Sequence, residues 1–363
     1  MEPTRPYIGG QAVLEGVMMR SPGSFAVVVR RRDGTLNIRE RVMSGGRRGL
    51  AKLPLFRGVA SLVESLRLGS EALKFSADLM QKDFDLPVVS SMLSLIRAIG
   101  FQLFLLATTE GNAETPPPAQ AEKKGIGPML VIMVLFLIAL PQITAAGIMK
   151  LFHVDWPVTT VQFQALTGGV KLTIVLGYLL LIRRMADIRR VFQYHGAEHK
   201  TISTYEANEP LDVEHARAKT TLHPRCGTTF LVMIVIISVF LFSILGAILG
   251  AFLPPTLTGS KFLDNALLLL IKLPALPLLA AVTFEIQRVF AKYCTTGPLR
   301  ALLVPGFLVQ KITTIEPDDS QLEVALASLR ATLLREEGHA GKGAKDVEFP
   351  TYAAMAAAAS LRG

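Results

Sequence analysis

The sequence predicts a mainly α-helical membrane protein with about four transmembrane helices, a small N-terminal β-rich cytoplasmic unit and amphipathic cytoplasmic helices. Three observations lead to this prediction. Half of the residues are hydrophobic and only 18% are charged, against about a quarter in soluble domains. The mean hydropathy of the chain is positive, at +0.42. The apolar residues are also gathered in long blocks, which is the pattern of membrane-spanning helices.

A helix that crosses the hydrocarbon layer needs about 20 apolar residues, because each residue advances the helix by about 1.5 Å. Four blocks reach or approach this length. The second is short and contains Lys171, whose side chain we expect to extend toward the nearer interface. The fourth contains Lys272 and two prolines, which predict a kink or contacts with partner helices. The blocks cover residues 128–151, 167–182, 230–253 and 266–284.

The distribution of basic residues predicts the orientation of these helices. Eleven Lys or Arg residues lie in the first 60 positions and eight lie between Arg183 and Arg225, whereas the link between the first two spans has none. Basic residues are enriched on the cytoplasmic side, so both termini and the middle segment are predicted to be cytoplasmic. This arrangement requires an even number of spans. A further apolar stretch, 86–108, has Arg97 at its centre and is therefore expected to be an interfacial or re-entrant helix rather than a fifth span.

The N-terminal region, residues 1–48, is predicted to form the β-rich unit. Two strand-like runs flank Asp33-Gly34, a dipeptide that is typical of a tight hairpin turn. Residues 49–109 are predicted to form amphipathic or interfacial helices, because leucine and valine recur on one helical face with charged residues between them. Such helices fit either a membrane surface or a surface of the cytoplasmic unit.

The remaining segments connect and extend the spans. Residues 110–127 contain three consecutive prolines and are predicted to be a flexible linker. The middle cytoplasmic segment, 183–229, begins with a proline-free helical stretch, and the C-terminal region, 285–337, ends in an amphipathic helix. Residues 338–363 are of low complexity and are predicted to be disordered. The transmembrane segments between these parts occupy residues 128–182 and 230–284.

Charge and cysteine content narrow the classes of function. The net charge of +9 is explained first by membrane topology, so no specific nucleic-acid binding is predicted. Cys226 and Cys294 lie far apart, which indicates no disulfide and fits a reducing cytoplasm. The N-terminus lacks the apolar core of a cleaved signal peptide. A transporter is a weaker hypothesis, because a polar transport pathway needs ionisable residues deep inside the spans and few are present there.

The helix that begins the middle segment carries the motif His195-Gly-Ala-Glu-His199. Residues three and four apart share a helical face, so His195, Glu198 and His199 are expected to point the same way. Two imidazoles at this spacing can bind one divalent ion, and Glu198 can act as a general base on metal-bound water. The order His-x-x-Glu-His is that of the inverzincin metallopeptidases. The alternative is a polar helix face whose histidines form hydrogen bonds.

Three further residues are candidate ligands on the same predicted membrane face. His223 and Cys226 lie just before the third span, and Glu285 lies at the end of the fourth. Together with the two histidines of the motif, Glu285 would leave an open coordination position, which is a catalytic arrangement. With His223 and Cys226 instead, the site would be closed and structural. The residue types alone do not distinguish the catalytic ligand set from the structural one.

Basic residues surround this region, and they have two interpretations. The first is attraction to anionic lipid headgroups, so the predicted partners are the lipid bilayer and its anionic headgroups. The second is a pocket for a phosphate or carboxylate of a substrate. Glu15 lies in a glycine-rich apolar stretch and either forms a local turn or reaches the cytoplasmic site. The basic residues are Arg189, Arg190, Lys200 and Arg225.

Several long motifs occur in a fixed order along the chain, at residues 9–20, 194–202, 223–228, 305–310 and 313–319. Together they resemble the YqhQ-like family of bacterial integral membrane proteins, over roughly residues 7 to 330. The resemblance implies a multi-pass protein of the bacterial inner membrane. It also favours a divalent metal ion such as zinc, because the family is a domain of unknown function often labelled a predicted metal-dependent enzyme. It supplies no catalytic residues.

Two functional hypotheses follow. The first is a metal-dependent hydrolase at the cytoplasmic membrane face, in which Glu198 is the base. The second is a non-enzymatic membrane protein whose basic cytoplasmic module binds anionic lipid or a partner, with any metal being structural. Metal content and the ligand set distinguish the two hypotheses.

Overall fold

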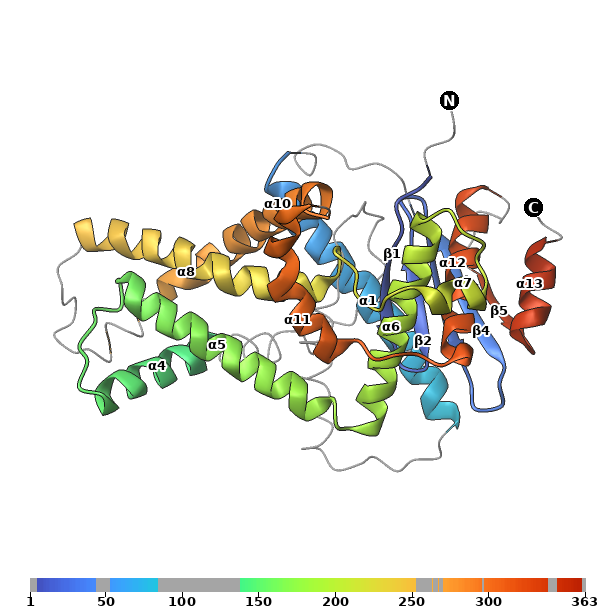
Figure 1. The fold of residues 1–363 in the computed structure, drawn as a ribbon, viewed down its shortest axis with the longest axis horizontal. Helices are drawn as coiled ribbons and strands as arrows, with labels where there is room; N and C mark the ends of the chain where they lie inside the picture. Colours follow the sequence, from blue (N-terminus) through green and yellow to red (C-terminus); the bar gives the residue numbers. More distant parts are fainter. Residues whose placement is uncertain are drawn as a thin grey trace.

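A computed structural model describes residues 5–43, 53–83, 138–252, 270–295, 297–338 and 345–360, together with Leu263 and Leu267. The predicted linker 110–127, the stretch 86–108 and the first ten residues of the first predicted span lie outside these residues. The described helices and strands form two regions, a unit built around a β-sheet and a bundle of long helices that extends from it (Figure 1).

The sheet has five antiparallel strands in the order β1-β2-β3-β4-β5. The predicted turn at Asp33-Gly34 joins two of them, β3 and β4. Gly34 has a φ of 88°, and the Asp33 carboxylate accepts hydrogen bonds from the Thr35 backbone N–H at 2.9 Å and from its hydroxyl at 2.7 Å. The first four strands are β1 (Gly9–Val13), β2 (Gly16–Arg20), β3 (Ser24–Arg30) and β4 (Leu36–Val42).

The fifth strand comes from the C-terminal tail and corrects the prediction that residues 338–363 are disordered. Strand β5 (Lys345–Phe349) pairs with β4, and helix α13 (Tyr352–Ser360) follows it. Met355 of α13 is buried. Pairing with the open edge of a distant strand orders this segment, and low complexity in the tail itself does not reveal such a partner.

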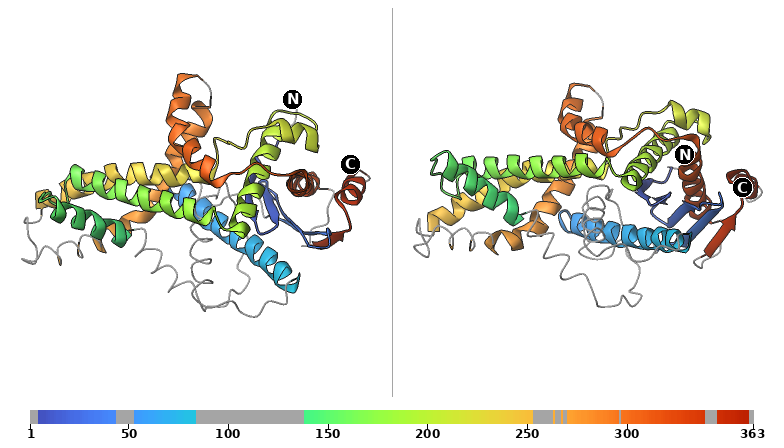
Figure 2. Two further views of the ribbon diagram at one scale, coloured as in Figure 1. Left: turned by 60° about the horizontal axis from the view of Figure 1, so that its bottom comes forward. Right: turned by 90° about the horizontal axis from the view of Figure 1, so that it is seen from below.

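Helices cover both faces of the sheet. Helices α6 (Ala186–Glu206) and α12 (Asp319–Glu336) lie on one face, where Ala26 and Val28 of β3 join their core. Helix α1 (Phe56–Asp83) lies on the other, where Val27 and Val29 join Leu68. A strand that is buried on both faces is continuously apolar, as β3 is. Figure 2 shows the three layers from two further directions.

Among the residues that the structure describes, three helices are long and apolar enough to cross a membrane: Val161–Ile182, Gly227–Leu249 and Leu270–Tyr293. They correspond to the second, third and fourth predicted spans. Of the first predicted span, only residues 138–151 are described, and they end in a shorter helix. The bundle helices are α4 (Leu140–Leu151), α5 (Val161–Ile182), α8 (Gly227–Phe252) and α10 (Leu276–Tyr293), with the short η3 (Leu273–Ala275) before α10.

Polar side chains inside the bundle are paired with each other. The Lys272 ammonium group donates hydrogen bonds to the side-chain oxygens of Gln142 at 3.2 Å and Gln164 at 3.3 Å. It also lies 5.3 Å from the centre of the Phe242 ring. Lys272 is only 7% exposed, so these contacts replace the water that the cation would otherwise require. They join α4, α5 and α8 to the segment before α10.

Segments far apart in the sequence meet in the sheet-containing unit. The N-terminal strands pack against α6 from the middle of the chain and against α12 near its end. Helix α5 leads into this unit, and α8 leads out of it again (Figure 1). The three segments for which the basic residues predict one membrane side therefore form a single folded unit at one end of the bundle.

Candidate metal centre

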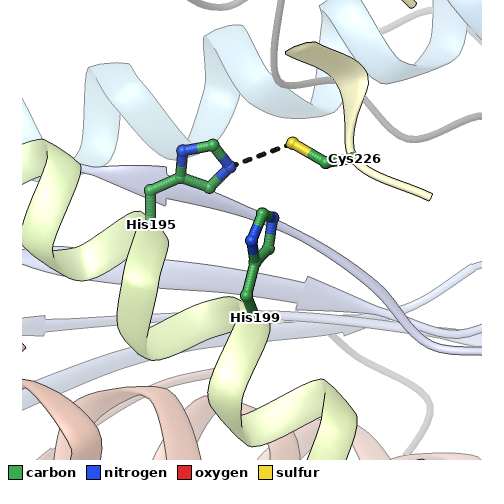
Figure 3. Close-up of side chains that lie close together, drawn as sticks. All are labelled: His195, His199 and Cys226. Carbon is green, nitrogen blue, oxygen red and sulfur yellow. Dashed lines mark hydrogen bonds between the residues drawn. The ribbon is translucent and has the colours of Figure 1, made fainter. Parts of the chain in front are cut away.

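Helix α6 presents His195 and His199 from successive turns of one face. Their ring centroids are 4.4 Å apart, and the two residues are at most 1% exposed. Cys226 approaches the same point from the segment just before α8, as Figure 3 shows. The spacing of four residues, which predicts a shared face, therefore produces a buried pair of imidazoles.

A close approach of two segments fixes the first histidine. The His195 Nδ1–H donates a hydrogen bond to the Thr313 carbonyl at 2.9 Å, and the Ile315 N–H donates one to the Phe192 carbonyl at 3.0 Å. Between these contacts, a Cβ atom at Gly196 would collide with the Ile315 carbonyl oxygen. Glycine in the motif thus allows the segment after α11 (Val304–Thr313) to lie directly on α6.

The second histidine is held in the same way by another carbonyl. The His199 Nδ1–H donates a hydrogen bond to the Thr221 carbonyl at 2.6 Å. In each histidine the proton is on Nδ1, so the lone pair is on Nε2. Among the residues that the structure describes, the buried Nε2 of His199 has no hydrogen-bond partner. Fixing the ring through the other nitrogen is the usual way in which proteins orient a metal-binding histidine.

Cys226 completes the cluster. Its sulfur lies 3.2 Å from the Nε2 atom of His195 and 3.2 Å from the hydroxyl of Thr228. The Thr228 backbone N–H donates to the same sulfur at 3.4 Å. Cys226 directly precedes the first residue of α8, where the helix N-terminus carries a partial positive charge. The cysteine is therefore a candidate ligand beside the two histidines.

Burial keeps both histidines neutral. Desolvation lowers the pKa of His195 to about 4, although its hydrogen bond to the Thr313 carbonyl opposes this shift. Desolvation also lowers the pKa of His199 well below its ordinary value, and His195 and His223 lower it further. A neutral imidazole has the lone pair that a metal ion requires. Both histidines are therefore in the protonation state of a metal ligand at neutral pH.

The ligand atoms of His195, His199 and Cys226 all lie within 4.8 Å of one another. Such a spacing fits three ligands around one ion, since zinc lies about 2.0–2.3 Å from nitrogen and sulfur ligands. The structure thus combines the two histidines of the motif with the cysteine of the second candidate pair. Of the two ligand sets considered from the sequence, the first has Glu285 in place of Cys226, and the second contains His223 in addition.

The structure places the other two candidate ligands against charged side chains. The Glu285 carboxylate accepts hydrogen bonds from Arg57, at 2.6 Å for Nε, and from the Leu55 N–H at 3.3 Å. It does not belong to the group of converging ligand atoms. The Nε2 atom of His223 lies 3.3 Å from the Glu206 carboxylate, and the His223 ring centroid lies 5.7 Å from that of His199. His223 thus borders the cluster.

Glu198, the predicted base, is 1% exposed and lies against the first strand of the sheet. A Cβ atom at Gly10 would lie 2.8 Å from a Glu198 carboxylate oxygen, so glycine leaves space for the acid there. Glu15 has a different role, because its carboxylate binds Arg190 at 2.5 Å and accepts a hydrogen bond from the Tyr194 hydroxyl at 3.3 Å. Glu15 therefore joins the turn between β1 and β2 to α6.

The other basic residues of the region also have defined neighbours. Lys200 donates a hydrogen bond to the Arg217 carbonyl at 2.8 Å and forms an ion pair with Glu316. Arg225 forms an ion pair with Glu206 and lies 4.4 Å from the centre of the Tyr7 ring. These contacts engage both cations within the protein. Arg189 is exposed and remains a candidate for contact with lipid headgroups.

Sequence reasoning missed the residues that hold the ligands in place. Gln310 accepts a hydrogen bond from the His223 N–H at 2.9 Å, and its amide donates to the His223 carbonyl at 2.8 Å and to the Thr229 hydroxyl at 3.0 Å. Thr221 and Thr313 act through backbone carbonyls, which every residue has, so their roles leave no signal in the sequence. Gln310 lies in one of the motifs, but nothing in the motif indicates its partners.

Comparisons with known proteins identify the family. A family model described as "Protein of unknown function (DUF1385)" matches residues 53–335. The chain is also 28% identical over 335 residues to "Uncharacterized protein YqhQ" of Bacillus subtilis (strain 168), in a match that covers 91% of this chain and 93% of the relative. No solved structure matches the chain. These matches confirm the resemblance that the motifs indicate, and the chain belongs to the DUF1385 family of proteins of unknown function.

Proposed function

We propose that this chain is a membrane-bound, metal-dependent hydrolase whose ion is held by His195, His199 and Cys226 at the cytoplasmic face. One observation carries the proposal: three buried ligand atoms, two from α6 and one from the segment before α8, lie within 4.8 Å of one another. Burying three polar groups together is costly unless they gain partners, and a shared ion is a partner for all three. Two imidazoles and a thiolate favour zinc.

The number of ligands supports a catalytic rather than a closed site. Three protein ligands leave one position of a tetrahedral ion open. A divalent ion held there would act as a Lewis acid and would lower the pKa of water in the open position. The Thr313 and Thr221 carbonyls orient His195 and His199 for this role. Glu198 lies one helical turn from His195, with its carboxylate against Gly10 and outside the converging group. As the proposed base it must turn toward the open position, where it would take a proton from the water that attacks a peptide, amide or ester.

The proposal places the hydrolytic site at the inner face of a bacterial inner membrane, with both termini in the cytoplasm. The folding of the N-terminal, middle and C-terminal segments into one unit supports this, because they must then lie on one side of the membrane. A reporter fused after Pro210 should indicate a cytoplasmic location. A periplasmic signal would overturn the topology.

Metal analysis of the full-length protein tests the ligand set. Protein purified without chelator should contain one zinc or other divalent ion per chain, and His199→Ala and Cys226→Ala should lose it. Glu285→Ala and Cys294→Ala are matched controls that should retain the ion, because neither residue belongs to the converging group. If the wild-type protein contains no stoichiometric metal and does not bind added zinc, the proposal fails.

The second candidate function is a non-enzymatic membrane protein with a structural ion. The near-complete burial of both histidines and of Cys226 favours this alternative, since structural sites are closed to solvent. Glu198→Gln separates the two functions. A hydrolase variant should keep its metal but lose at least about 100-fold in turnover of ester or amide test substrates. If wild-type protein with a full complement of metal hydrolyses none of them, the structural function is favoured.

A further inference from the structure

The end of α10, the short η4 (Pro298–Leu303) and α11 form a helical hairpin with exposed apolar side chains. No described part of the chain covers these side chains. Six large apolar residues on it are between 46% and 60% exposed. Clustered apolar exposure of this kind marks an interaction surface. These residues are Val289, Tyr293, Leu299, Leu302, Val304 and Leu308.

The charge of the same hairpin has one sign. Residues 286–315 contain four Lys or Arg residues and no Asp or Glu. Arg288, Lys292 and Arg300 are exposed among the apolar residues. Lys292 and Arg300 lie near aromatic rings, 5.1 Å from Tyr293 and 5.9 Å from Phe307. Basic side chains interleaved with leucine and tyrosine are typical of surfaces that lie in the headgroup region of a membrane.

The position of the hairpin fits the same environment. In both views of Figure 2 the end of α10 and the start of η4 project sideways from the long axis of the bundle, near the sheet-containing unit. If the long helices cross the bilayer, an element that projects sideways at this level lies along the membrane surface. The first arm of the hairpin is the last part of a candidate span, Leu270–Tyr293, so it leaves the bilayer at this level. Its exposed apolar residues would then meet acyl chains and its cations would meet headgroups.

Both arms of the hairpin contact the metal centre. Gln287 of α10 donates a hydrogen bond to the Cys226 carbonyl at 3.1 Å. On the other arm, the Thr313 carbonyl accepts a hydrogen bond from His195, and Gln310 binds His223. A membrane surface that holds the hairpin therefore fixes the level of the ligand cluster relative to the bilayer.

We propose that residues 287–295 and 297–311 form an interfacial hairpin that binds anionic phospholipid, and that it holds the centre formed by His195, His199 and Cys226 at the level of the lipid headgroups. The proposed lipid contact depends on the membrane placement in the proposed function. It does not depend on whether the protein is a hydrolase. Combined with the proposed function, it narrows the substrate class to molecules presented at the membrane surface.

Fluorescence of a single tryptophan tests this placement in the full-length protein. The chain has one tryptophan, Trp156, so a Trp156→Phe background leaves an inserted Leu302→Trp as the only reporter. In phosphatidylcholine vesicles with about a quarter phosphatidylglycerol, brominated acyl chains on either lipid should quench this tryptophan. Val42→Trp, at the exposed end of β4, is the matched control and should not be quenched.

The lipid preference is read from the ratio of the two quenchers. Brominated phosphatidylglycerol should quench the Leu302→Trp reporter at least about twofold more than brominated phosphatidylcholine at equal content. Replacing Arg288, Lys292 and Arg300 by glutamine should remove the preference and leave quenching by phosphatidylcholine. The charge control Arg39→Gln and Arg217→Gln, on the sheet-containing unit, should leave the preference unchanged.

Two results would overturn the proposal. Absence of quenching at both Leu302→Trp and a second reporter, Leu299→Trp, would show that the hairpin does not lie in the bilayer. Equal quenching by the two lipids would show that it does not select anionic headgroups. The metal content of each variant is measured in parallel, which separates failure of the lipid proposal from failure of the proposed function. If the protein contains no metal but its hairpin tryptophan is quenched, the hydrolase proposal fails and the lipid proposal stands.

Discussion

The consecutive helices α5 and α6 bury opposite kinds of side chain. On α5, Val161, Leu180 and Leu181 are between 51% and 65% exposed, whereas on α6 His195 and His199 are at most 1% exposed. Exposed leucine on a long helix is favourable where the surrounding medium is apolar, and buried histidine is favourable only with hydrogen-bond or metal partners. The change occurs within the few residues between the two helices, so the environment of the chain also changes there.

The comparison separates two ways of packing. In the sheet-containing unit, specific contacts such as the one between Gly196 and the Ile315 carbonyl decide the fold. In the bundle, the outer surface needs only to be apolar, and specificity is confined to internal groups such as Lys272 and its glutamine partners. Substitutions should therefore have large steric effects in the unit and large polarity effects on the bundle.

The largest effect is expected for Gly196→Ala. A Cβ atom there collides with the Ile315 carbonyl oxygen, and the segment that carries Thr313 must move away from α6. The expected loss of stability is more than about 3 kcal/mol, with loss of bound metal, as measured by unfolding in detergent and by metal analysis. Gly177→Ala on α5 is the control, because no atom lies within 4 Å of its added Cβ. Equal melting temperatures for the two variants would contradict the steric argument.

A charge on the bundle surface is expected to have the next largest effect. Phe240 of α8 is 65% exposed, yet Phe240→Asp should disfavour membrane insertion by on the order of 3 kcal/mol. The measurement is the inserted fraction of α8 in a host protein with a reporter on each side. In the full-length protein, Val42→Asp, at an exposed position of the sheet, should change stability by less than about 1 kcal/mol. If Phe240→Asp left the inserted fraction of α8 unchanged, this surface would face water.

Acid should destabilise the metal-free unit. Burial lowers the pKa of His195 from 6.5 to about 4, so the unfolded chain binds more protons than the folded one between these values. The contribution of this neutral histidine is present above pH 6.5 and is lost as the pH falls toward 4. At pH 5 the loss should be about 2 kcal/mol, since one pKa unit corresponds to about 1.4 kcal/mol.

Thermal unfolding after chelation, at pH 8 and pH 5, measures this effect. His195→Gln should flatten the pH dependence. His215→Gln is a contrasting control, because the hydrogen bond that His215 donates to the Asp212 carboxylate raises the pKa of this partly exposed histidine and makes its contribution opposite in sign. A wild-type protein with the same melting temperature at both pH values would contradict the buried, neutral state of His195.

Local patterns in the sequence predict much of this molecule. Composition and block length predict three long apolar helices that the structure contains, and Asp33-Gly34 predicts the hairpin between β3 and β4. The spacing of His195 and His199 predicts their shared face. Each of these features depends on residues close together in the chain, whose effect on local structure is direct.

Features that depend on distant contacts could not be obtained in this way. Cys226 was one of several candidate ligands, and only the path of the chain brings it rather than Glu285 to the histidines. Arg57, which binds Glu285, lies more than two hundred residues away along the chain. The ordering of β5 has the same origin, because its partner strand β4 is near the other terminus.

The smallest effect is expected for the ion pair that joins these two strands. Arg39 binds Asp346 at 2.8 and 2.6 Å, but the two side chains are 36% and 57% exposed. Water and salt screen such a pair, so Arg39→Ala should cost less than about 0.5 kcal/mol. Phe349→Ala should cost about 1–2 kcal/mol, because that ring packs on the core of the unit. Melting temperatures at low and high salt distinguish the two contributions. If Arg39→Ala were the more damaging change, charge rather than strand pairing and apolar burial would hold the tail.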